Sequence, residues 1–227
     1  MFDRKSLEDA TKDYDGDKYH EEFYSDHLKV LRSAQEFSED VKKAVKYLFL
    51  WKLGKVSLRK TNSSSKLDYS DSKGRFYFSI KTTETNQKIM KKATDKEMLQ
   101  NAFSFRENQM NYNGFKQCVQ KITTSNPDKV TSVVLKTFYV HIWRPDEFPI
   151  FDTNVWKAFY KEKGKLVCPN TKPHSFLDYE KYTPFFKKLV QDTGLDWRTV
   201  DRGLWVIGKR LAQKARKNRC VACQMER

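Results

Sequence analysis

Two ionisable residues in the stretch 122–164, Asp152 and Lys129, are of the types that could carry out chemistry. A carboxylate fixed beside a reacting carbon stabilises a developing positive charge and orients or deprotonates an attacking water molecule or amine. An amine that is neutral when it attacks forms a Schiff base, which permits bond cleavage by elimination. Each residue also has a plainer interpretation, because Asp152 suits a helix N-cap and Lys129 suits a phosphate contact or a solvated first turn.

Two predicted helix starts would position these residues. The tripeptide at 126–128 combines a favoured N-cap, a proline suited to the first helical position and an acid at the positive helix end. The helix that begins there ends at Arg144-Pro145, because the residue before a proline is pushed out of the α region. The residues at 148–151 then form an extended apolar connector. Asp152 follows as the N-cap of a second helix, which Gly164 can close.

The rest of the chain is predicted to be mostly α-helical. Apolar residues recur at helical spacing over 19–36, 38–54, 85–121 (interrupted near 111–114), 179–193 and 197–212, and Ser38 suits an N-cap. The Ser- and Asn-rich segment at 61–75 reads as a loop, and the alternating residues after it allow a short hairpin near 67–81. We expect one domain over 1–227, with an acidic N-terminal segment at 1–18 and a basic C-terminal tail at 212–227.

The segment around Asp152 resembles a known family of enzymes. Residues 148–159, which read FPIFDTNVWKAF, are similar to the catalytic-aspartate segment of the helix-hairpin-helix DNA glycosylases. That superfamily includes endonuclease III, the adenine glycosylases and the oxoguanine glycosylases. Residues 129–135, which read KVTSVVL, are similar to the helix that precedes the aspartate in the family. Residues 196–211 are similar to the closing helix of glycosylase-like proteins.

The resemblance implies a two-lobed helical fold and an enzyme of base excision repair. Such an enzyme flips a damaged, modified or mispaired base out of the DNA stack and cleaves its N-glycosidic bond. Asp152 would be the catalytic carboxylate. Lys129 would be the amine if the enzyme also has AP lyase activity.

Candidate binding residues lie within this segment and N-terminal to it. A flipped base needs a flat apolar slot, for which the candidates are Trp51, Trp143 and Trp156, with Asn154 of the motif beside them. The candidates for contacts to DNA phosphates are Lys52, Lys55, Arg59, Ser125 and Asn126. The alternative interpretations are that the aromatic residues belong to the core and that the basic residues form a solvated surface.

The charge distribution favours nucleic acid as the partner. The chain of 227 residues carries 44 Lys and Arg against 29 Asp and Glu, a net charge of +15. Residues 1–40 hold 6 basic and 12 acidic side chains, whereas 41–92 hold 14 basic and 3 acidic. The excess of basic residues is therefore concentrated in one part of the chain, as in proteins that bind a polyanion. No apolar run approaches the roughly 18 residues of a membrane span. We therefore expect DNA as the partner, no membrane, no obligate protein partner, a monomer, and an intracellular location in a prokaryotic cytoplasm or a eukaryotic nucleus.

No cofactor is expected. Cys220 and Cys223 have the spacing of a metal or redox pair, and a zinc site would have to recruit Cys168 and His174. The scattered positions of the four cysteines favour free thiols.

Two other functions remain open. Residues 123–127 contain no glycine, although the hairpin loop of the family approaches a DNA phosphate with its glycine amides. A non-catalytic nucleic-acid-binding protein that retains the fold is therefore the main alternative. A metal-dependent nuclease at Asp68, Asp71 and Lys81 lacks a carboxylate beside the lysine.

Overall fold

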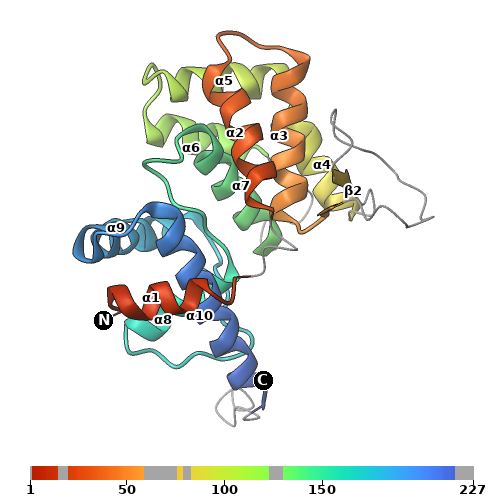
Figure 1. Cartoon of the computed structure of the whole chain (residues 1–227). Helices are drawn as coiled ribbons and strands as arrows, with labels where there is room; N and C mark the ends of the chain where they lie inside the picture. Colours follow the sequence, from red (N-terminus) through yellow and green to blue (C-terminus); the bar gives the residue numbers. More distant parts are fainter. Residues whose placement is uncertain (1, 15–19, 59–75, 79–82, 123–129, 218–227) are drawn as a thin grey trace, which may run out of the picture. The chain divides into compact units, whose positions relative to one another are not determined.

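The computed structural model describes residues 2–14, 20–58, 76–78, 83–122 and 130–217 (Figure 1). Within this part of the chain there are ten helices and one pair of short strands, so the predicted mostly helical class is confirmed. The chain divides into two compact units. Unit 1 comprises Met1–Tyr14, Asp128–Thr137 and Asp146–Arg227, and unit 2 comprises Asp15–Pro127 and Phe138–Pro145. The single-domain organisation stays a prediction.

Unit 2 is a helical body with an aromatic core. Its helices are α2 (Glu21–Ser33), α3 (Glu39–Lys52), α4 (Glu84–Ala93), α5 (Lys96–Arg106), α6 (Tyr112–Gln120) and the C-terminal part of α7 (Val130–Trp143). The rings of Phe105 and Phe115 stack at 4.2 Å, and Tyr139 of α7 packs against Phe115 and against Phe49 of α3. All four side chains are fully buried, so helices far apart in the sequence share one core.

A short antiparallel strand pair belongs to unit 2. Strand β1 (Val56–Leu58) pairs with β2 (Phe76–Phe78), with Val56 opposite Phe78 and Leu58 opposite Phe76. The hairpin that we expected near 67–81 is thus only partly right. Its second strand lies in that range, but the first strand directly follows α3, before the Ser-rich segment, which lies outside the described residues.

Unit 1 is built around one long helix. Its elements are α1 (Arg4–Thr11), the N-terminal part of α7, α8 (Thr153–Glu162), α9 (Phe176–Thr193) and α10 (Trp197–Lys217). Helices α1 and α8 both pack against α10 (Figure 1). Two glycines of α10 permit these contacts. A Cβ at Gly203 would lie 2.9 Å from the side chain of Leu7 in α1, and a Cβ at Gly208 would lie 1.9 Å from the carbonyl oxygen of Asn154 in α8.

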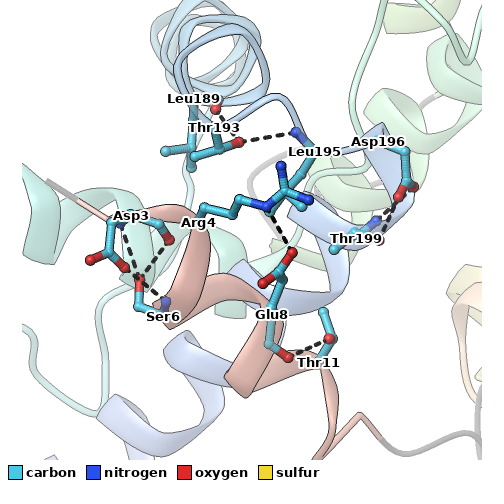
Figure 2. Close-up of polar contacts among 10 residues, drawn as sticks. All are labelled: Asp3, Arg4, Ser6, Glu8, Thr11, Leu189, Thr193, Leu195, Asp196 and Thr199. Carbon is cyan, nitrogen blue, oxygen red and sulfur yellow. Dashed lines mark hydrogen bonds and ion pairs between the residues drawn. The ribbon is translucent and has the colours of Figure 1, made fainter.

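Local hydrogen bonds close the helix ends of unit 1. Asp3 and Ser6 form a capping box at the start of α1, and the Asp196 carboxylate accepts the Thr199 amide at 3.0 Å at the start of α10 (Figure 2). Gly194 ends α9 with φ of +64°, a conformation that glycine adopts without steric cost. These caps satisfy amide and carbonyl groups that the helices themselves leave without partners.

Most of the predicted helices are present, with three differences. The range 85–121 holds three helices: Asn111 caps a new one at the interruption predicted near 111–114, but Asp95 caps another that was not predicted. Helix α1 lies inside the acidic N-terminal segment, where no helix was predicted. The basic C-terminal segment is helical as far as Lys217, the end of α10. In the described part of the chain, no helix is both long enough and apolar enough to cross a membrane.

Candidate functional site

Asp152 is the N-cap of α8, as its sequence context predicts. Its Oδ1 accepts hydrogen bonds from the amide of Asn154 at 2.8 Å and from the amide of Val155 at 3.1 Å. The side chain is half-buried. Two bonds to one oxygen orient the carboxylate with respect to the helix axis, so its position follows that of the first turn of α8.

The backbone that leads into Asp152 is anchored on α9. The hydroxyl of Tyr179 donates to the carbonyl of Pro149 at 3.1 Å. Phe151 is fully buried, and its ring lies 5.3 Å from the ring of Tyr179 and 5.2 Å from that of Tyr182. On the other side, Gly208 allows α10 to touch the backbone of Asn154. Contacts from two helices therefore hold the apolar connector and the first turn of α8.

Lys157 is a buried lysine one and a half turns after Asp152. It is only 4 % exposed, and it has no hydrogen bond or ion pair in the part of the chain that the structure describes. Burial lowers the pKa of Lys157, the positive charge of Arg216 lowers it further, and the negative charge of Asp152 opposes both effects. Lysine is seldom buried without a partner, and a lowered pKa brings such an amine closer to its neutral, nucleophilic form.

Polar groups from α9 and α10 complete this centre. Tyr182 is fully buried and its hydroxyl has no hydrogen-bond partner among the described residues. Burial raises the pKa of Tyr182 well above its ordinary value, and the negative charges of Asp201 and Asp152 raise it further. Asp201 is itself 7 % exposed and accepts a hydrogen bond from Arg198 at 2.6 Å. Three helices thus bring two carboxylates, a hydroxyl and an amine into one electrostatically coupled cluster.

The three tryptophans expected to stack on a base are core residues. Trp51 and Trp143 are each 2 % exposed, and Trp156 is 4 % exposed. The indole of Trp51 donates to the carbonyl of His20 at 3.1 Å and lies 4.5 Å from the ring of Tyr24. Stacking on a base requires an open ring face, so the expectation for these three residues is corrected: they contribute packing.

The expected phosphate contacts are only partly covered by the structure. Lys52 and Lys55 are both half-buried, and the ammonium of Lys52 lies 5.8 Å from the centre of the Phe138 ring. Arg59, Ser125, Asn126 and Lys129 lie outside the described residues. Asn154, which was expected to bind the substrate, is half-buried, and its backbone amide donates a hydrogen bond to the Asp152 carboxylate.

The described residues contain no group of three or more His, Cys, Asp or Glu side chains that could hold a metal ion. Cys220 and Cys223 lie outside them, as do the residues considered for a nuclease. Cys168 is in a disulfide and Cys118 is a free thiol. The expectation of free thiols was therefore wrong for Cys168.

The involvement of Lys157, Tyr182 and Asp201 was not predicted from the sequence. The residues from Val155 to Phe159 are all buried, so α8 is enclosed on every side there, and a lysine in such a run could have drawn attention. Tyr182 lies on the predicted apolar stripe of α9, where its hydroxyl gives no signal. No pattern in the sequence indicates that Asp201 interacts with Tyr182.

Comparisons of this chain with family models, with curated proteins and with solved structures give no match. The candidate site therefore rests on the geometry of Asp152 and its neighbours in unit 1.

Proposed function

We propose that this protein is a DNA glycosylase that cleaves the N-glycosidic bond of a flipped damaged, modified or mispaired base. The observation that carries the proposal is the oriented, half-buried carboxylate of Asp152, in a segment that resembles the catalytic segment of that superfamily. The net charge of +15 adds support, because such an excess attracts a polyanion.

The chemistry assigns a direct role to Asp152. Cleavage of the glycosidic bond leaves positive charge on the sugar, and a fixed carboxylate beside the anomeric carbon stabilises that charge without having to reorganise. The same carboxylate can orient or deprotonate the attacking water molecule. The capping bonds of Asp152 support this role, because they fix the carboxylate on the first turn of α8.

The test compares two aspartates that have the same structural role. Asp152 caps α8 and Asp95 caps α5 through bonds to backbone amides. Asparagine is also a good N-cap, so Asp152→Asn and Asp95→Asn should both keep their helices while each loses one negative charge. The variants and the wild type are incubated in chelator with a panel of lesion-bearing duplexes and then treated with alkali, which reveals released bases as strand breaks.

We expect Asp152→Asn to slow base release by about 10²–10³-fold, because this is the usual effect of losing one electrostatic contact to a transition state. We expect Asp95→Asn to leave the rate of base release unchanged. Equal rates in the two variants would refute the role of Asp152.

A non-catalytic DNA-binding protein remains the second candidate. The burial of Trp51, Trp143 and Trp156 favours it, because these rings offer no stacking face to a flipped base. This function would be established if the wild type and Asp152→Asn bound duplex DNA equally and neither produced an abasic site in any duplex of the panel.

A further inference from the structure

Unit 1 contains a cavity that is separate from the Asp152 cluster. It has a volume of about 400 Å³ and lies between the C-terminal end of α8 and α9. This volume falls in the range of about 300–1,000 Å³ that is usual for small-molecule sites. The cavity borders Glu162, at the opposite end of α8 from Asp152, and at about 1.5 Å per residue the two positions are about 15 Å apart along the helix.

Two lysines that line the cavity have no carboxylate partner in the ranges that the structure describes. Lys188 also lines the cavity, but Asp192 holds its ammonium group at 2.8 and 2.9 Å. The ammonium of Lys163 lies 5.6 Å from the ring centre of Phe159, and Lys181 has no ion pair or hydrogen bond to another described residue. Within the part of the chain that the structure describes, neither Lys163 nor Lys181 is paired with an acid. Two lysines without an acidic partner among the described residues therefore line one small cavity.

An aromatic ring supplies an apolar wall. Phe185 is half-buried and lines the cavity next to Pro184. The ring of Phe185 is supported from behind by Phe159 at 5.1 Å and by Tyr182 at 6.0 Å between ring centres. A supported ring at the edge of a cavity can pack against a flat apolar group of a ligand without first having to be ordered.

The charges of the lining limit the charge of a ligand. Three lysines and two acids line the cavity, Glu162 and the paired Asp192 being the acids, and together they leave one formal positive charge. A phosphate monoester carries about −1.5 to −2 at neutral pH, which two unpaired ammonium groups can match. A di- or triphosphate would bring more negative charge close to Glu162.

We infer that this cavity binds the phosphate of a nucleotide, with Lys163 and Lys181 contacting the phosphate and Phe185 packing against the base. The same chemistry is found in a free nucleoside monophosphate and in the 5′-phosphorylated end of a DNA strand. Binding here requires no cleavage of a glycosidic bond, so the inference is independent of the proposed role of Asp152.

The test is calorimetric titration of the full-length protein with adenosine 5′-monophosphate, adenosine and inorganic phosphate. The variant Lys163→Gln/Lys181→Gln is compared with Lys161→Gln/Lys187→Gln. Both double variants remove two exposed charges, one from α8 or its C-cap and one from α9, but Lys161 and Lys187 do not line the cavity.

We expect the first double variant to bind adenosine 5′-monophosphate at least about tenfold more weakly and the second to bind it within about twofold of the wild type. We also expect Phe185→Leu to weaken binding of the monophosphate and to leave binding of inorganic phosphate unchanged. The inference is overturned if the monophosphate does not bind to the wild type, or if both double variants lose affinity equally, since the effect would then come from net charge alone.

A competition experiment then distinguishes the two candidate ligands, a free nucleoside monophosphate and the 5′-phosphorylated end of a DNA strand. A 5′-phosphorylated single-stranded oligonucleotide is added to the monophosphate complex, with the 5′-hydroxyl oligonucleotide as its control. Displacement by the phosphorylated strand alone supports the site and assigns it to a DNA end. Failure of both strands to displace the bound monophosphate supports a site for free nucleotides. Equal displacement by both strands would overturn recognition of the phosphate monoester.

The result of the nucleotide-binding experiment does not depend on the result of the glycosylase test. A protein that releases bases but binds no monophosphate would overturn only the inference about this cavity. A protein that binds the monophosphate but releases no base would overturn only the proposed glycosylase function.

Discussion

Replacing Gly208 with alanine should displace the first turn of α8 and, with it, the carboxylate of Asp152. The new Cβ would lie 1.9 Å from the carbonyl oxygen of Asn154, 2.5 Å from its carbonyl carbon and 3.0 Å from its Cα. All three are backbone atoms, so a change of rotamer cannot relieve the contact. Ordinary van der Waals contact begins at 3.4 Å, so the carbonyl oxygen would have to move by about 1.5 Å.

The expected magnitude follows from two opposing effects. Alanine is favoured over glycine inside a helix by about 0.8–1.0 kcal/mol, whereas overpacking costs about 1–3 kcal/mol. We therefore expect the free energy of unfolding to fall by up to about 2 kcal/mol in Gly208→Ala. Because a misplacement of about 1 Å can cost about 10²-fold in rate, base release should fall far more than stability does.

The assay pairs this variant with Gly203→Ala on the same helix. There the nearest atom to the new Cβ is the mobile end of the Leu7 side chain at 2.9 Å, and the nearest backbone atom lies 3.0 Å away. We expect this control to stay within about 1 kcal/mol of the wild type in urea denaturation, because the gain in helix propensity offsets a small adjustment of Leu7.

Amide hydrogen exchange provides a measurement that does not depend on activity. Protection of the Asn154 and Val155 amides, which are bonded to Asp152, should fall in Gly208→Ala and not in Gly203→Ala. The reasoning would be refuted if the two variants had equal stability and equal protection at these two amides.

Two further predictions concern the buried polar centre. Because the pKa of Lys157 is lowered in the folded state, the unfolded chain binds more protons, and the stability of the wild type should rise as the pH increases from the lowered pKa towards the ordinary value of 10.5. Lys157→Met should abolish that rise and increase the free energy of unfolding at neutral pH by about 1 kcal/mol. Urea denaturation across this pH range measures both effects, and an unchanged pH dependence would contradict the lowered pKa of Lys157. Tyr182→Phe should also increase the free energy of unfolding by about 1 kcal/mol, because it removes a buried hydroxyl that has no partner among the described residues. A loss of stability in urea denaturation would instead show that this hydroxyl makes a stabilising hydrogen bond.

Local sequence signals predicted many of the helix boundaries. Ser38 and Asp152 accept amides at the starts of α3 and α8, and α7 ends just before Arg144-Pro145, as their chemistry requires. These features depend on a few consecutive residues, so they can be read without knowledge of the fold.

Features that depend on distant contacts were missed. Helix α1 lies in an acidic, polar segment, and the two residues that it buries, Leu7 and Ala10, are too few to give a periodic pattern. Its packing against α10 at Gly203 supplies the missing stabilisation. Strand β1 was missed for a related reason, because its partner β2 begins 18 residues after β1 ends.

The sequence by itself determined the mostly helical class, the principal helix caps, the strongly positive charge and the selection of Asp152 as the candidate catalytic carboxylate. Each of these depends on composition or on residues within a few positions. Only the tertiary structure decided which side chains surround that carboxylate. Lys157 and Tyr182 interact electrostatically with Asp152, and Asp201 interacts with Tyr182. These interactions and the burial of the three tryptophans depend on how the helices pack against one another. The cavity beside Lys163 and Lys181 has the same origin, since its walls come from two helices whose facing surfaces are fixed only when they pack.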